Sequence, residues 1–316
     1  MKNITFNYSL GEELMERLLT AYDRQYGVHG FRPETHAPQH LFIPKGMKRG
    51  KLAWRHWLAR AAGTDYRTQS MQHYAGHAML HGKHPALYTW EASMYMPIMV
   101  EHILKSEGFS KWESMSRQLP VLANTFAKEF EDDPLNLYKG GSIESVLKFR
   151  RDFKKANGYQ GLFGFGPKIS SLYAIFLEEE GLVRIEDALP VDIWVQQIFI
   201  ATGIITLLGS VRGVALENEI RLFLCDLCAR RSWSRVNLCH ALWFLGNRGC
   251  NSCYRHNEME FACVLWKNCQ GRATSIDYSE KGIWNPSSMS YRKGGSRTFR
   301  LEPVAADSPQ HPLFKE

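Results

Sequence analysis

Hydrophobic residues recur every three or four positions along most of this chain, and few stretches alternate as a half-buried strand would. Such spacing places apolar side chains on one face of a helix. It predicts helices over residues 52–62, 66–81, 87–105, 121–131, 143–156, 167–179, 192–202, 214–230 and 235–246. Another helix is expected after Ser9, where Glu12 completes a capping box. The pattern therefore predicts a mainly α-helical protein.

Breaks in this pattern divide the chain into four consecutive parts. We expect an N-terminal helical region over 1–115, a helical core over 116–235, a cysteine-bearing region over 236–283 and a loose basic tail over 284–316. Within the first part, residues 24–51 are rich in Gly, Pro and His and predict a long loop. No secretion signal or membrane span is evident, so we expect a cytoplasmic monomer.

A glycine-rich turn between two predicted helices is the first candidate for function. Gly164 and Gly166 flank one apolar residue, and Pro167 suits the first position of the helix that follows. Free amides at such a helix start attract anions. Basic residues precede the turn, and these are Lys148, Arg150, Arg151, Lys154 and Lys155. Together with a formal net charge of +7, they favour a polyanion as the ligand.

Two residues near this turn are able to perform chemistry. Lys168 is in the first turn of the helix after the glycines, and Asp192 follows Pro190 and Val191 directly before another helix. Asp192 is by position a helix cap, and capping alone would explain it. Alternatively, Lys168 and Asp192 converge on a single groove.

All seven cysteines fall in the last third of the chain. The spacing Cys250-x2-Cys253-x9-Cys263-x5-Cys269 can wrap four thiolates around one metal centre, either an iron-sulfur cluster or a tetrahedral zinc ion. Cys225 and Cys228 lie in a helical apolar run, which favours ordinary buried thiols. Cys239 is expected to bind no metal either.

The hairpin, the aspartate and the cysteines together resemble the helix-hairpin-helix DNA glycosylases, the superfamily that includes endonuclease III. That family's L-P-G-V-G-x-K-x-A hairpin is matched by residues 162–170, with Phe163 in place of the proline, and its P-V-D segment is matched by residues 190–192. Trp194 stands where many members have histidine. The final x5 interval of the cysteines also agrees with the C-terminal [4Fe-4S] loop of the endonuclease III branch.

The resemblance implies a helix-hairpin-helix glycosylase core over 116–235 and a [4Fe-4S] cluster loop over 236–283, with zinc as the alternative metal. It implies that Asp192 is the catalytic carboxylate and that Lys168 is the Schiff-base lysine of members that also cleave the strand. The implied substrate is double-stranded DNA that contains a damaged or modified base, and the implied location is the nucleoid. In such an enzyme the N-terminal region contributes to a base pocket, with His73, Tyr74, His77, Trp90 and Tyr95 as candidates.

Several functions stay open within and beside this resemblance. The expected activity is excision of a damaged or modified base by a DNA N-glycosylase, with or without strand cleavage at the abasic site. The base could instead be a bulky hypermodified pyrimidine in phage DNA, which would make the protein an antiviral defence enzyme. Two more candidates are a base-modifying transferase built on the same fold and a non-catalytic DNA-binding module. The histidine stripe of residues 73, 77 and 81 indicates either a metal site or a polar wall.

Overall fold

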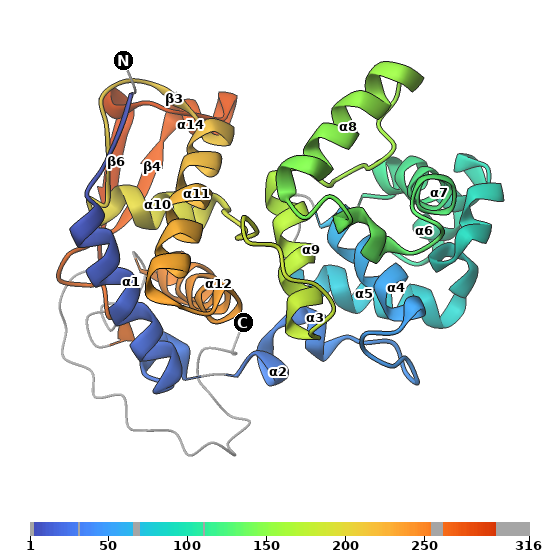
Figure 1. Ribbon diagram of the computed structural model, residues 1–316, viewed down its shortest axis with the longest axis horizontal. Helices are drawn as coiled ribbons and strands as arrows, with labels where there is room; N and C mark the ends of the chain where they lie inside the picture. Colours follow the sequence, from blue (N-terminus) through green and yellow to red (C-terminus); the bar gives the residue numbers. More distant parts are fainter. Residues whose placement is uncertain (1–2, 31, 66–69, 110, 254–261, 295–316) are drawn as a thin grey trace. The chain divides into compact units, whose positions relative to one another are not determined.

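The computed structural model describes residues 3–30, 32–65, 70–109, 111–253 and 262–294. These residues are mainly α-helical, as the spacing of hydrophobic residues predicted (Figure 1). The chain forms two compact units, each assembled from separate stretches of sequence. Unit 1 is drawn from residues 1–30, 193–216 and 240–316, and unit 2 from residues 31–192 and 217–239. These units therefore cut across the four consecutive parts expected from sequence.

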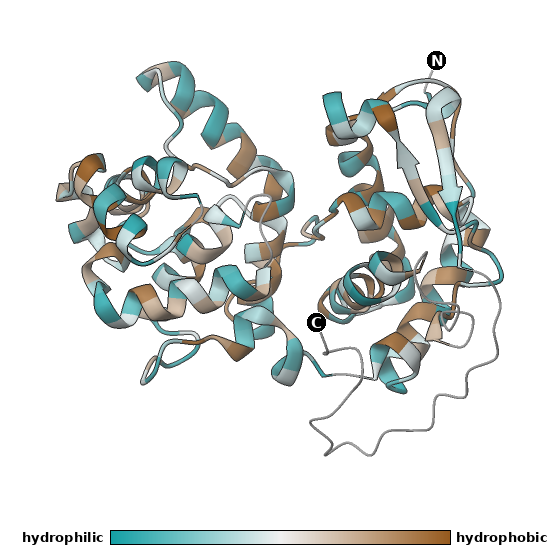
Figure 2. Ribbon diagram, turned by 180° about the vertical axis from the view of Figure 1, so that it is seen from behind, coloured by the Kyte–Doolittle hydropathy of each residue, from teal (hydrophilic) through white to brown (hydrophobic). Residues whose placement is uncertain are grey.

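Unit 2 is a helical bundle. Its helices are α2 (Pro33–His36), α3 (Pro38–Leu41), α4 (Leu52–Thr64), α5 (Ser70–Lys83), η2 (Pro85–Tyr88), η3 (Trp90–Met94), α6 (Pro97–Ser106), α7 (Trp112–Glu129), η4 (Pro134–Tyr138), α8 (Ile143–Asn157) and α9 (Pro167–Glu179). Helices α4 and α9 are buried on almost every side and supply Trp54, Trp57 and Tyr173 to the core. In contrast, α8 buries only a narrow apolar stripe and presents hydrophilic residues outward (Figure 2).

Unit 1 combines helices with short antiparallel strand pairs. Its helical elements are α1 (Tyr8–Asp23), η1 (Gly27–His29), α10 (Ile193–Ala201), η5 (Leu245–Cys250), α14 (Ile276–Lys281) and η6 (Pro286–Ser288). Its strand pairs are β1 (Ile4–Phe6) with β2 (Ile205–Leu207), β3 (Val211–Arg212) with β5 (Ile283–Trp284), and β4 (Arg272–Ser275) with β6 (Met289–Arg292). Two of the boundaries between the units fall within helices, α11 (Gly213–Arg231) and α12 (Arg235–Phe244), and the other two follow Gly30 and Asp192.

Some predicted elements differ from the observed ones. The expected loop over 24–51 contains η1, α2 and α3, because Pro33 and Pro38 each start a short helix. The expected helix over 87–105 is two 3₁₀ turns followed by α6, which begins at Pro97. The first part of the predicted tail forms β5, η6 and β6. Residues 295–316 of that tail lie outside the described residues.

Among the helices that the structure describes, none combines the length and the apolar character needed to cross a membrane.

Candidate functional site

The glycine turn is a rigid hairpin between α8 and α9 in unit 2. Ser142 caps α8 by accepting a hydrogen bond from the Ser145 amide, and the helix ends at Gly158. Gly164 adopts a φ of +76°, and a Cβ at this position would lie 1.6 Å from the carbonyl oxygen of Gly63 in α4. Only glycine fits this close approach. The next residue, Phe165, is fully buried in the core of the unit, so its side chain anchors the hairpin to that core.

The hairpin amides are already partly engaged. The Gly166 N–H donates to the Gly164 carbonyl oxygen at 2.7 Å, so a phosphate would have to compete with this bond. The Lys168 backbone N–H, in the first turn of α9, hydrogen-bonds the carboxylate of Glu217. The anion expected at this helix start is thus supplied by the protein itself. Of the two glycines predicted to hold phosphate, Gly164 keeps an amide with no hydrogen bond among the described residues.

Glu217 of α11 is the residue that sequence reasoning missed. It is half-buried as a residue, yet its Oε1 atom is buried and has no hydrogen-bond partner among the described residues. Burial raises the pKa of this carboxyl to about 7, and nearby Asp192 acts in the same direction, whereas Lys168 and Arg221 oppose the shift. A carboxyl with such a pKa can exchange a proton near neutral pH. No local motif marks a lone glutamate in a helix, so only the fold reveals it.

Lys168 and Asp192, the two predicted catalytic residues, belong to the same unit and both act on the Glu217 carboxyl. Each is half-buried, which leaves part of its surface accessible. Asp192 immediately precedes α10, as its predicted capping position requires. The structure therefore gathers an amine and two carboxyl groups around the start of α9.

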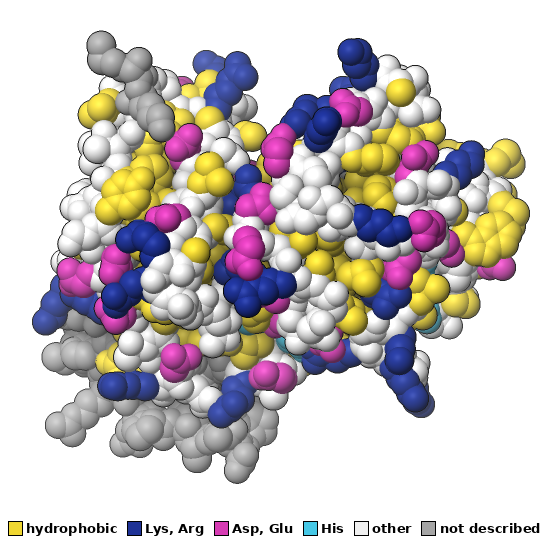
Figure 3. Space-filling view, in the orientation of Figure 1, with side chains coloured by type: hydrophobic (Ala, Val, Ile, Leu, Met, Phe, Trp, Pro, Cys, Tyr) yellow, Lys and Arg dark blue, Asp and Glu magenta, His cyan; other side chains and the backbone are white. Residues whose placement is uncertain are grey.

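The predicted basic residues lie on α8, before the hairpin. Lys148, Lys154 and Lys155 are exposed, and Figure 3 shows dark blue side chains at the end of unit 2 that carries α8. Arg151 is also exposed and pairs with Glu144 at 2.6 Å. Arg150 is half-buried and donates from Nε to the Leu162 carbonyl oxygen at 3.1 Å. Arg150 thus fastens α8 to the hairpin, and the other four present their charges to solvent.

The five candidate residues for a base pocket differ in how far they are buried. His73, Tyr74 and His77 are buried in the bundle. The Nε2 atoms of His73 and His77 lie 3.1 and 2.9 Å from the Thr64 hydroxyl, and His77 Nδ1 lies 2.6 Å from the Tyr88 hydroxyl.

Burial is also the main electrostatic influence on these histidines. It lowers the pKa of both His73 and His77, which favours the neutral form of both rings. Trp90 is 49% exposed and Tyr95 is half-buried. The buried members are therefore a polar layer of the core.

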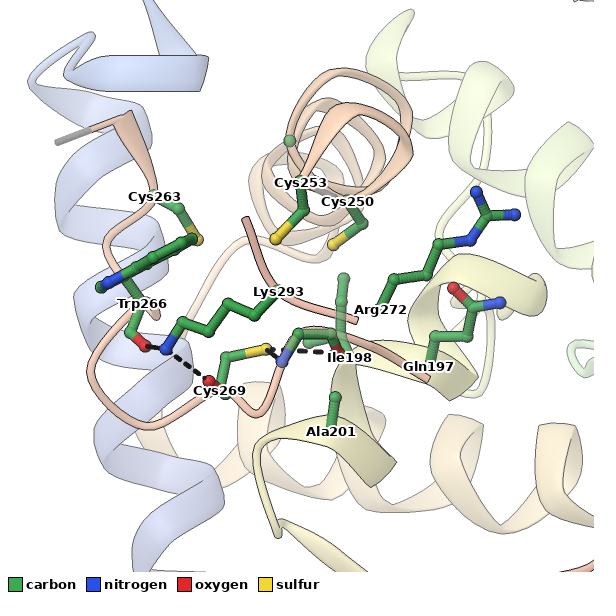
Figure 4. Close-up of a pocket in the computed structure, with 12 residues that line it drawn as sticks. Gln197, Ile198, Ala201, Cys250, Cys253, Cys263, Trp266, Cys269, Arg272 and Lys293 are labelled. Carbon is green, nitrogen blue, oxygen red and sulfur yellow. Dashed lines mark hydrogen bonds between the residues drawn. The ribbon is translucent and has the colours of Figure 1, made fainter. Parts of the chain in front are cut away.

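The four predicted metal ligands line a single pocket in unit 1. Cys250 ends the π-helical turn η5, and Cys253 follows one turn later with its sulfur directed into the same space (Figure 4). Cys263 and Cys269 approach from the segment beyond residues 254–261, which lie outside the described part of the chain. A π-helical turn is rare and is frequently found at functional sites.

The thiols of these cysteines are not bonded to one another. None of them forms a disulfide. Burial raises the pKa of Cys253, Cys263 and Cys269, and that of Cys263 reaches about 12, so without a bound cation the thiols stay protonated. All four are described residues, and no three of their sulfurs lie within 4.8 Å of one another. A tetrahedral zinc ion would hold sulfurs about 3.8 Å apart, given its bond lengths.

The remaining cysteines are buried thiols of unit 2, as expected. Cys225 and Cys228 lie on α11 and Cys239 lies on α12, and none of the three lines that pocket. Burial raises the pKa of Cys225 and Cys228 to about 12 and raises that of Cys239 as well, which makes these thiols unreactive.

Comparisons with known proteins add no further assignment. No protein-family profile matches the chain. A search of curated proteins likewise found no match.

Proposed function

We propose that this chain is a DNA N-glycosylase that excises a damaged or modified base. The observation that carries the proposal is the arrangement in unit 2, where the hairpin between α8 and α9 presents Lys168 beside Glu217 and Asp192. A carboxylate can stabilise or activate the cleavage of a glycosidic bond, and an amine can serve as the nucleophile in place of water. The exposed cations of α8 add the phosphate-binding surface that double-stranded DNA needs.

The proposed reaction begins with extrusion of one nucleotide, because the glycosidic bond is inaccessible in a stacked duplex. Asp192 stabilises the positive charge that develops on the sugar as the base leaves. Lys168, with its amine deprotonated, attacks the sugar carbon and displaces the base, and the resulting Schiff base permits β-elimination of the strand. Glu217 takes up the proton that the Lys168 ammonium releases before the attack, since its pKa of about 7 suits that exchange.

For unit 1 we propose a [4Fe-4S] cluster bound by Cys250, Cys253, Cys263 and Cys269. Four thiol donors around one pocket fit such a group, and the final x5 interval of the cysteines supports it over the alternative, a single zinc ion. When bound, the cluster would supply a covalent cross-link between the end of η5 and the segment that carries Cys269. We assign it no step in base excision.

Base release is the experiment that tests this function. The full-length protein is incubated with duplexes that carry oxidised, alkylated or hypermodified bases, and the released base is identified by mass spectrometry. Borohydride is expected to trap a covalent protein–DNA adduct with the wild type and none with Lys168→Ala, whereas Lys139→Ala, which alters an exposed lysine of the same unit, serves as the control.

Three further outcomes have distinct meanings. Base release without a trapped adduct would show that water is the nucleophile and that Lys168 only positions the substrate. DNA binding without any base release would contradict the proposed enzymatic activity and favour a non-catalytic DNA-binding module. A reaction that needs a second substrate would favour a base-modifying transferase.

A further inference from the structure

Lys293 reaches the cysteine pocket from a part of the chain beyond the four cysteines. It directly follows β6, and its Nζ atom donates to the carbonyl oxygens of Trp266 at 2.6 Å and Cys269 at 2.8 Å. The same ammonium lies 4.2 Å from the centre of the Trp266 ring (Figure 4). Three contacts from one side chain fix both Lys293 and the segment that carries Cys269.

The backbone beside Lys293 contacts the other half of the cysteine set. The Gly294 N–H donates to the carbonyl oxygen of Cys253 at 2.9 Å. The end of β6 therefore connects Cys253, which precedes residues 254–261, with Cys269, which follows them. A local clasp of this kind holds ligands that would otherwise be joined only by a long stretch of chain.

The strand pair beneath this clasp is also built for close contact with the cysteines. β6 pairs with β4, in the register that places Arg272 opposite Arg292. Gly271 precedes β4 with a φ of +104°, and a Cβ there would lie 2.4 Å from the Arg292 carbonyl oxygen. The Gly271 N–H points at the Cys269 sulfur at 3.3 Å. The backbone N–H of Gly271 and the side chain of Lys293, at the ends of the strand pair, therefore both contact Cys269.

The positive charge of Lys293 is suited to a pocket that would hold a negatively charged metal centre. Four thiolates around a [4Fe-4S]²⁺ cluster or a zinc ion leave a net negative charge in a largely buried pocket. Two cations, Lys293 and Arg272, line that pocket. Both hydrogen bonds of Lys293 go to neutral carbonyl groups, and no carboxylate among the described residues pairs with it. Its positive charge is available to the metal centre.

We propose that Lys293 is a positioning residue of the cysteine centre, clasping the two halves of the ligand set and offsetting the negative charge of the loaded site. The inference rests on the metal centre proposed above and is independent of base excision. It also assigns a structural role to the strand pair of β4 and β6, part of which was expected to be a loose tail.

Metal retention tests this proposal. Iron and zinc are measured by mass spectrometry in the full-length wild type and in Lys293→Met, which keeps the aliphatic stem but removes the charge and the donors. The rate of metal transfer to a chelator is then followed. We expect Lys293→Met to lose metal about 10- to 100-fold faster, the usual effect of removing a partner of a metal ligand. Lys267→Met, at an exposed position of the same segment, is the matched control.

A second readout separates charge from simple packing. With iron bound, the reduction potential of the centre should become more negative in Lys293→Met and stay near the wild-type value in Lys293→Arg, because a nearby cation stabilises the reduced, more negative state. If Lys293→Met is unstable, Lys293→Gln replaces it and should lose metal faster than Lys293→Arg.

Two results would overturn the proposal, and they have different meanings. Loss rates equal to those of the wild type and Lys267→Met would exclude Lys293 as a clasp while leaving the centre intact. If the wild-type protein contained neither iron nor zinc, the proposed metal centre itself would be contradicted. An absence of base release would affect neither measurement.

Discussion

Glu217 combines burial with neighbours that a purely structural glutamate would not need. Its Oε1 atom is buried without a hydrogen bond, while its carboxyl group shares its surroundings with Lys168 and Asp192. Leaving a buried polar atom unpaired costs about 1–3 kcal/mol, which selection tolerates mainly where function requires it. A carboxyl group with one unpaired oxygen beside an amine is consistent with a group that holds a proton only transiently.

The stability of Glu217→Gln provides the first prediction. Because the folded pKa of about 7 lies above the unfolded value of 4.5, the carboxyl stabilises the fold fully at pH below 4.5, and that contribution is lost as the pH rises through 7. Glutamine stays neutral at every pH. The variant should therefore unfold with a free energy on the order of 2 kcal/mol higher than wild type at pH 8, a value discounted for partial exposure, and with little difference at pH 4.

Urea denaturation at the two pH values measures this difference, and Glu219→Gln on the same helix controls for the loss of one negative charge. Base release should fall in Glu217→Gln even as stability rises, since a residue kept for function commonly lowers stability. A variant less stable than wild type at pH 8 would contradict the assignment and make Glu217 a structural residue.

Asp192→Asn provides the second prediction. The positive charge on the sugar develops whichever nucleophile attacks, so the variant should lose base release by at least about a hundredfold while DNA affinity persists. Single-turnover kinetics and a binding assay on the same duplex measure the two effects. Asp152→Asn, at an exposed position of α8 in the same unit, is the control. Equal base release by Asp192→Asn and wild type would leave Asp192 as a helix cap.

At the level of helices and strands, local signals explain which predictions were accurate. Sequence predicted α8 and α9 almost to the residue, because Ser142, Gly158 and Pro167 mark their ends locally. It missed the strands, because β1 pairs with β2 and β3 with β5 across long separations in the chain. Glu217 and Lys293 were missed for the same reason, since tertiary contacts alone bring them to the sites they serve.

Helix α8 gives the third prediction. Its exposed cations, Lys148, Arg151, Lys154 and Lys155, should contact DNA phosphates, so affinity should fall log-linearly with salt concentration. Replacing one phosphate-contacting lysine, as in Lys154→Gln, should reduce the slope of that plot by about one. Fluorescence anisotropy over a salt series measures it, with Lys128→Gln on α7 as the control. A slope that α8 substitutions leave unchanged would make this surface an ordinary solvated face.

The division of the chain into two units places the two proposed sites in separate parts of the protein. The amine and carboxyl groups belong to unit 2, and the four cysteines belong to unit 1. The two sites can therefore be tested separately, since a variant directed at one leaves the residues of the other unchanged. A metal that holds unit 1 together need take no part in base excision, which is why the proposed reaction uses only residues of unit 2.

Metal removal provides the last prediction. Protein purified without oxygen should be brown and contain about four irons per chain, the stoichiometry of the cluster. Because structural metal binding adds directly to folding free energy, Cys269→Ser should lose the iron and lower the protection of unit 1 amides against hydrogen exchange. The loss should appear in α10, β4 and β6, whereas α4, α7 and α9 of unit 2 keep their protection.

Exchange measured by mass spectrometry distinguishes the two units, and Cys225→Ala, at a buried thiol outside the pocket, should retain its metal and serve as the control. Zinc in place of iron would replace the cluster with a single ion and require the sulfurs to gather about 3.8 Å apart, whereas no three of them now lie within 4.8 Å of one another. Equal deprotection of both units in Cys269→Ser would contradict a metal centre whose stabilising effect is confined to unit 1.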